Sequence, residues 1–178
     1  MALVSEETIR RQTLLDIARQ IIIAACTAPK GRGRDTLAVF LAEGDTIEQL
    51  ALQMEKIGER EDAHFFIRDA GNIRLSPVIV FIGSKILAGG IPACGYCGFT
   101  NCAGKDKYPE VPCVFNGVDL GIAVGSAVTV AAACKADNRV MFSVGKAAIE
   151  LGLVDKDIKI LFGIPLTSSS KSPFFDRK

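Results

Sequence analysis

Apolar residues near the start of the chain recur at the spacing of an α-helix. Over residues 6–25 they fall along one side of a helical wheel, at Ile9, Leu14, Ile17, Ala18, Ile21 and Ala25. Ser5 precedes them as a candidate N-cap, and the acidic residues that follow it favour a helix start. Pro29 disfavours the α conformation at the residue before it, so we expect the helix to end there.

Three short runs of apolar residues predict buried strands, at residues 36–42, 76–83 and 157–164. Unbroken apolar runs of this length are typical of strands that are covered on both faces of a sheet. Between the first two runs a second helix is expected to begin at Gly44-Asp45. Its apolar face would carry Ile47, Leu50, Met54 and Ile57.

The segment over residues 84–116 follows neither period, and loops of this length usually have a function of their own. After it, we expect Asn116 to cap a third helix over 117–136, and a fourth helix to cover 143–151. The longest uncharged apolar stretch, 120–134, is too short to cross a membrane and is interpreted as part of a buried helix.

The order of elements predicts a mixed α/β protein, more narrowly of the α+β class. We expect one domain over residues 1–178, with an apolar sheet covered by helices on both faces and a cysteine-rich loop inserted at 84–116. A polar, basic tail follows the last strand. No internal repeat or linker separates two cores.

Composition excludes several classes of protein. With 178 residues, 49% hydrophobic and 23% charged, the chain can form a core and is not expected to be disordered. A net charge of +1 argues against a nucleic-acid partner, since phosphate-binding proteins usually carry a larger basic excess. The N-terminus lacks the pattern of a secretory signal, so we expect a cytoplasmic protein that does not associate with membranes.

The positions of the six cysteines are more informative than their number. Four of them, Cys94, Cys97, Cys102 and Cys113, form the spacing C-x2-C-x4-C-x10-C. In a reducing compartment such a cluster indicates metal binding or catalysis rather than disulfides. The two others, Cys26 and Cys134, end apolar helical runs and are expected to be packing residues.

Two metal centres compete for these four cysteines. Zinc knuckles also begin C-x2-C-x4, but they have histidine as third ligand, and zinc ribbons prefer two C-x2-C pairs. The one histidine of the chain, His64, is distant in sequence and is interpreted as structural. Four thiolates at uneven spacing fit an iron–sulfur cluster best, with four-thiolate zinc as the alternative. The glycines after Cys94 and Cys97 would let the backbone turn tightly around the centre.

The sequence resembles the uncharacterised prokaryotic proteins that contain a ferredoxin domain. The resemblance lies in ACGYCGFTNC (93–102), PCVFNGVDLGIAVGSA (112–127), CTAPKGRG (26–33) and FIRDA (66–70). It implies that the four cysteines bind a [4Fe–4S] cluster. That family has no established activity, so the resemblance indicates a cofactor and no reaction.

A second, weaker resemblance is to the nitroreductase family of FMN enzymes. It lies in AACTAP (24–29), DLGIAV (119–124) and LFGIP (161–165). In that family an N-terminal arginine and basic groups near the C-terminus hold the FMN phosphate. The resemblance implies that Lys30, Gly31, Arg32 and Arg34 could do so here, with Arg177 and Lys178 in the tail. The alternative is a basic helix end that complements the helix dipole.

Several other features have structural explanations. Arg68 and Asp69 are expected to form a surface or capping ion pair, and no glycine-rich segment has the spacing of a P-loop. Glycines and alanines recur every fourth residue in the third helix, and such rows let another backbone approach closely. We therefore expect a homodimer that packs through this helix.

Taken together, these features predict a cytoplasmic iron–sulfur redox protein that transfers electrons or acts as a reductase with a flavin. Its redox partner, a protein or a small-molecule acceptor, and its catalytic residues are not identified by the sequence. The alternatives are a non-enzymatic electron carrier or sensor and a structural domain stabilised by zinc.

Overall fold

The computed structural model describes residues 3–175. Its helices are α1 (Glu6–Thr27), α2 (Asp45–Arg60), α3 (His64–Arg74), α4 (Cys102–Asp106), α5 (Val114–Ala133) and α6 (Phe142–Glu150). Its strands are β1 (Leu37–Glu43), β2 (Val78–Lys85), β3 (Asp137–Asn138) and β4 (Ile158–Thr167), and a short 3₁₀ turn, η1 (Gly31–Gly33), follows α1.

The four strands form one antiparallel sheet in the order β1-β2-β4-β3. β2 lies inside the sheet, where Val78 pairs with Glu43 of β1 on one side and with Leu166 of β4 on the other. The register of β2 against β4 becomes irregular between Ser84 and Lys85. The regular sheet therefore ends just where the cysteine-rich segment leaves it.

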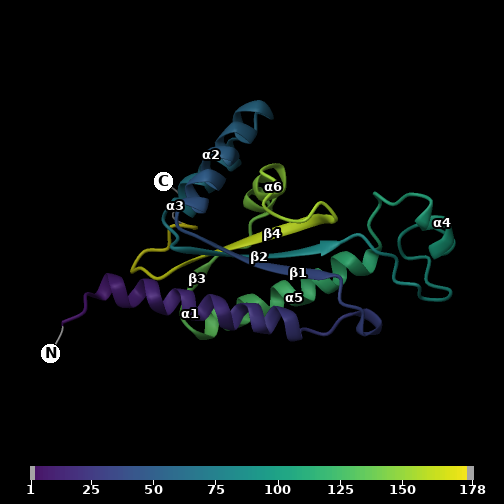
Figure 1. Cartoon of the computed structure of the whole chain (residues 1–178), viewed down its shortest axis with the longest axis horizontal. Helices are drawn as coiled ribbons and strands as arrows, with labels where there is room; N and C mark the ends of the chain where they lie inside the picture. The colour runs from purple at the N-terminus through teal and green to yellow at the C-terminus, as the bar shows by residue number, and fades with distance from the viewer. Residues whose placement is uncertain (1–2, 176–178) are drawn as a thin grey trace.

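Helices cover both faces of the sheet, as the sequence predicts. α1 and α5 lie side by side against one face, and α2, α3 and α6 lie on the other (Figure 1). The side chains of β2 alternate between these layers: Val80 and Ile82 face α1 and α5, whereas Ile79 and Phe81 face the opposite group. Both faces are buried, which explains why this strand has no polar alternation.

Four elements differ from the expectations. Helix α3 was not expected, although Phe66, Ala70 and Ile73 are buried at helical spacing. The short strand β3 and the five-residue helix α4 were not expected either. The third predicted helix begins at Val114 rather than at Gly117, because Cys113 occupies the N-cap position that we assigned to Asn116.

The ion pair of Arg68 with Asp69 is also more than a surface contact. Asp69 is buried, and its second carboxylate oxygen accepts a hydrogen bond from Ser143 Oγ at 2.7 Å. Since Ser143 lies in α6, the pair joins α3 to α6 beneath the surface. The expectation of an exposed or capping pair was wrong for the carboxylate, and the reason is its second partner across the helix interface.

Helix α5 is the most apolar helix of the described chain, and by length and composition alone it could cross a membrane. One side of it packs against α1 and the sheet through Leu120, Ala123, Ala127 and Ala131. Its other side is exposed, and the positions of Gly117, Gly121 and Gly125 have open space next to them. The expectation of a buried helix therefore holds for one side of α5 only.

Candidate metal centre

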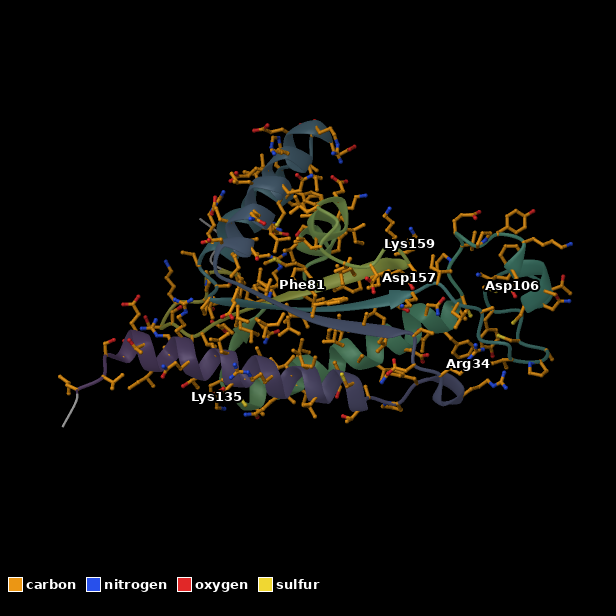
Figure 2. The ribbon with its side chains drawn as sticks, in the orientation of Figure 1. Arg34, Phe81, Asp106, Lys135, Asp157 and Lys159 are labelled. Carbon is orange, nitrogen blue, oxygen red and sulfur yellow. The ribbon has the colours of Figure 1, made fainter. Side chains whose placement is uncertain are left out.

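The four motif cysteines lie in residues 86–113, a segment between β2 and α5 that we call the cysteine lobe. It extends beyond the sheet at one end of the molecule's long axis and carries the short helix α4 (Figure 1). Arg34 and Asp106 both lie at this end, Arg34 below the lobe and Asp106 on α4 (Figure 2). The lobe thus lies outside the two helical layers.

All four cysteines line one hollow of about 280 Å³, a volume that includes space open to solvent. Cys94, Cys97 and Cys102 are half-buried around it, and Cys113 is buried. The backbone turns between them through Gly95 and Gly98, which have φ values of 63° and 85°. Only glycine adopts such values without strain, so the expected role of the glycines after Cys94 and Cys97 is confirmed.

Local contacts hold the outer wall of the lobe. The Asn101 side chain accepts a hydrogen bond from Gly104 N–H at 2.9 Å and so caps α4, whose first residue is Cys102. The rings of Phe99 and Tyr108 stack with centroids 5.4 Å apart. These contacts within the protein therefore fix the position of Cys102 without a bound metal.

Cys113 approaches the hollow from the body of the protein. It is the N-cap of α5, so its sulfur lies where the positive end of a 20-residue helix favours negative charge. Residues 88–90 pass close to it, since a Cβ added to Gly89 would lie 3.7 Å from Cys113 Sγ. A thiolate, or a centre bound by thiolates, would therefore be electrostatically favoured here.

Asn116 joins the two ends of the cysteine lobe, a role that we did not predict from the sequence. Its buried side-chain oxygen accepts from Cys113 N–H at 3.0 Å and from Leu87 N–H at 3.3 Å. Its side-chain amide donates to Leu87 O at 3.1 Å. One residue thus fixes the start of the lobe against its end. The signal for this role in the sequence is that Asn116 lies three residues after Cys113, which is the spacing of a capping box.

The basic segment after α1 is brought to the base of the lobe. Lys30 donates to the carbonyls of Cys26 and Ala28, at 2.6 and 2.8 Å, and so caps the C-terminus of α1. Arg32 donates to Gly90 O at 2.6 Å, and Arg34 to Ala88 O at 3.2 Å. Gly31 N–H donates to buried Asp119 of α5 at 2.9 Å. These contacts support the helix-end interpretation for Lys30 and attach the lobe to the body.

A further ion pair lies where the lobe leaves the sheet. Lys85 Nζ and Asp157 Oδ2 are 2.7 Å apart, joining the end of β2 to the turn before β4. Hydrogen bonding to Asp157 raises the pKa of Lys85, and the same contact lowers the pKa of the Asp157 carboxyl. Both side chains are largely exposed, so solvent screens this pair.

The cysteines surround a space instead of converging on one point. A tetrahedral zinc ion requires its sulfurs about 2.3 Å from a single centre. Within residues 3–175, no three cysteine, histidine, aspartate or glutamate side chains are gathered closely enough to hold one metal ion. Four soft sulfur ligands around one hollow, with no histidine among them, are the donor set that iron–sulfur clusters use.

A larger hollow, of about 1440 Å³ including space open to solvent, lies at the other end of the sheet. Among its lining residues, Arg10 Nε, Ser76 Oγ and Thr167 Oγ1 are buried and have no hydrogen-bond partner. Arg11 and the N-terminal turn of α2 also border it. Buried polar atoms are normally paired, so three unpaired ones around one hollow suit a polar ligand.

The remaining candidate residues have no place in either hollow. Cys26 is exposed at the end of α1, so its expected packing role was wrong: the helix turns this position away from the sheet. Cys134 is half-buried and packs at the edge of the core, as expected. His64 is exposed at the first position of α3. Arg177 and Lys178 lie outside the described residues.

Comparison with known sequences relates the chain to one family. Residues 110–177 match the family described as "Uncharacterized protein containing a ferredoxin domain". This match includes Cys113 and begins after the other three cysteines. An uncharacterised protein of Archaeoglobus fulgidus is 37% identical over 182 residues, which cover 98% of this chain and 97% of that protein.

Comparison with solved structures identifies the fold. An FMN-bound nitroreductase of Desulfitobacterium hafniense matches with a TM-score of 0.60 and 14% identity, over 96% of this chain and 81% of its own. A nitroreductase of Lactococcus lactis in complex with chloramphenicol matches with a TM-score of 0.63 and 12% identity, over 94% and 81%. The expected nitroreductase-like fold is confirmed. At these identities the likeness concerns the fold alone.

Proposed function

Because the chain belongs to the family of uncharacterised proteins that contain a ferredoxin domain, we propose that it is a redox protein with an iron–sulfur cluster in the cysteine lobe. The cluster would be a [4Fe–4S] centre bound by Cys94, Cys97, Cys102 and Cys113. The observation that carries this proposal is that all four cysteines line one hollow. Cysteine thiolates are the usual ligands of such clusters.

The surroundings of the hollow suit this centre better than zinc. The donor set is four thiolates with no histidine, and such a set suits a cluster of iron and sulfide atoms. Gly95 and Gly98, each directly after a cysteine, adopt the positive φ values that the turns beside the ligands require. A bound cluster would supply one-electron chemistry, while the protein's residues determine its orientation, its charge environment and its access to solvent.

Metal analysis and spectroscopy of anaerobically purified protein test the proposal. The protein is expected to be brown, with broad absorbance near 400 nm, and to contain iron and sulfide. Cys97→Ser should lose most of the iron, whereas Cys26→Ser should keep it, since Cys26 is exposed on α1 and does not line the hollow. A colourless protein with one zinc per chain would instead indicate a structural domain stabilised by zinc.

A second candidate is a flavin enzyme, which the larger hollow favours. Two structures of this fold are described as containing FMN. The hollow carries what a phosphate group needs: the Arg10 and Arg11 guanidinium groups, the unpaired hydroxyls of Ser76 and Thr167, and the N-terminal turn of α2. This site replaces Lys30, Arg32 and Arg34 as our candidate, because those residues donate to backbone carbonyls beside the lobe.

Flavin analysis distinguishes a flavin enzyme from a carrier. Supernatant from heat-denatured protein should contain FMN, and Arg11→Met should reduce the amount per chain. Lys156→Met, at an exposed position in the turn before β4 that does not line this hollow, is the control. Brown protein that releases no flavin and binds none on titration would indicate an electron carrier or sensor that acts on a partner protein. We propose a cytoplasmic location for either form, since thiolate-bound clusters persist in reducing compartments.

A further inference from the structure

The cysteine lobe encloses a charged side chain. Lys105, in α4, is 3% exposed, and it is the one buried residue between positions 85 and 112. Lysine is almost never fully buried unless its charge is paired, and the enclosed residues of a small lobe are normally apolar. The most protected residue of this lobe is therefore a lysine.

The described residues compensate this charge only weakly. Lys105 Nζ lies 3.9 Å from Asp106 Oδ1, at the outer limit of an ion pair, and the Asp106 side chain is 61% exposed. Solvent screens such a pair, so its attraction offsets only a small part of the desolvation free energy of a buried ammonium group. A buried cation with a weak partner points to a further negative charge nearby.

The cysteines are placed to supply that charge. Helix α4 begins at Cys102, and Lys105 lies three residues later on the same face. Residues three apart on a helix have their Cβ atoms about 5–6 Å from each other. The four thiolates of a cysteine-bound cluster outweigh the positive charge of its iron–sulfide core, so the loaded centre is anionic.

We propose that Lys105 is the counter-charge of the iron–sulfur cluster and sets its reduction potential. This inference rests on the proposed function. Reduction adds an electron to an already anionic centre, and a buried cation stabilises the reduced state more than the oxidised state. Lys105 would thereby raise the reduction potential. In the metal-free protein the same ammonium group would lack its partner and destabilise the lobe.

Other cations near the lobe are less suited to this role. Lys107 is exposed two residues later, and Arg32 and Arg34 are exposed at the base, where they donate to carbonyls. Exposed charges act through water and salt, whereas Lys105 acts from a protected position. Lys107 is consequently a matched control, with the same charge on the same loop.

The test compares Lys105→Met, Lys105→Arg and Lys107→Met with wild type in anaerobic protein. Iron per chain is measured first, and the midpoint potential of the iron-containing protein follows by spectroelectrochemical titration. We expect Lys105→Met to shift the midpoint potential to more negative values. Lys105→Arg keeps the positive charge, so most of the wild-type potential should be retained. Lys107→Met should leave the potential near the wild-type value. An iron-loaded Lys105→Met protein with an unshifted potential would overturn the inference and leave the proposed function intact. A wild-type protein without iron would overturn both.

Melting temperatures provide a second readout, which remains decisive where Lys105→Met fails to retain iron. In metal-free protein, Lys105→Met should melt at a higher temperature than wild type, because it removes the uncompensated charge. In the iron-loaded protein, the rise in melting temperature caused by Lys105→Met should vanish or become a fall. A lysine that serves only as a packing residue would change both forms in the same direction, and a metal-free variant no more stable than wild type contradicts the inference.

Discussion

At the scale of single residues, the site depends on polar side chains that do not touch the hollow. Asn116 illustrates this, since its amide group connects Leu87 and Cys113, at the two ends of the cysteine lobe. From the sequence, an asparagine near the start of a helix is expected to be its N-cap. The structure gives that position to Cys113, and Asn116 makes the reciprocal contact from the first turn.

Asn116→Ala should therefore loosen the lobe at its base. The change leaves the part-buried Leu87 carbonyl and the N–H groups of Leu87 and Cys113 without their side-chain partner, and we expect a loss of about 1–3 kcal/mol in unfolding free energy. Chemical denaturation measures this loss, and iron content should fall with it. Asn72→Ala, in α3, is the matched control, because no side-chain hydrogen bond is found for Asn72 among the described residues.

A second residue-scale prediction concerns Arg74. Its guanidinium group donates to Glu48 and Glu55, and these hydrogen bonds lower the pKa of both carboxyl groups below their ordinary 4.5. A lowered pKa in the folded state contributes stability above about pH 4.5, which is lost as the pH falls through the lowered values. Arg74→Gln should thus lower the melting temperature modestly at pH 7.

The same comparison at acid pH provides the check on Arg74. The difference in melting temperature between wild type and Arg74→Gln should shrink steadily below pH 4.5, since protonated carboxyl groups no longer attract the guanidinium group. A difference that is independent of pH would show that Arg74 acts through packing alone. High salt should also reduce it, because these side chains are near the surface.

At the scale of elements, the contact of α6 with the sheet leaves no room for a methyl group. A Cβ on Gly145 would overlap the carbonyl oxygen of Leu161 in β4. We expect Gly145→Ala to destabilise the protein by about 1–3 kcal/mol or more, because helix and strand would have to separate. Gly71→Ala, in the open middle of α3, should instead stabilise it by up to about 1 kcal/mol through helix propensity. Equal effects of the two changes in thermal denaturation would contradict this account.

The elements also show what the sequence alone predicts well. Long helices with clear apolar faces, such as α1 and α2, and the unbroken apolar strands were found close to their observed positions. Helix α3 was missed because two exposed apolar residues, Phe65 and Ile67, flank its first core position and hide its period, and because only a short turn separates it from α2. The order of strands could not be predicted, because pairing depends on contacts between distant segments.

The candidate site also combines features that the sequence predicts with features that it does not. The four cysteines and the turns at the glycines were predictable from spacing, because cysteine in this pattern has few other uses. The roles of Arg32 and Arg34 were not, since nothing local in a basic loop tells whether it binds a phosphate or a carbonyl. The buried state of Lys105 was also hidden, because a lysine in a polar loop is normally exposed.

At the scale of the whole molecule, the exposed side of α5 suggests an assembly. Val118 and Ile122 are 45% and 41% exposed there, beside the glycine row, and the one charged residue of the helix, Asp119, is buried on the other side. Small residues allow a second helix to approach closely, so we propose that two copies pack through this face. Light scattering at micromolar concentration should give twice the chain mass of 19.0 kDa.

A substitution on the exposed face of α5 provides a second test of the dimer. Ile122→Lys places a charge on the exposed face and should give a folded monomer, since the substituted side chain already faces solvent in the single chain. Wild-type protein with a mass near 19.0 kDa would refute the dimer. Circular dichroism of the variant confirms that its fold is retained.

The place of the lobe at one end of the long axis has a consequence for how electrons would enter and leave (Figure 1). Electron tunnelling weakens steeply with distance, and a cluster in this position is separated from the surrounding water only by its own loop. A redox partner that docks on this end would therefore come within tunnelling range without any movement in the sheet or its helices. Dioxygen has the same short route, so we expect the brown colour to bleach in air while the body of the protein stays folded.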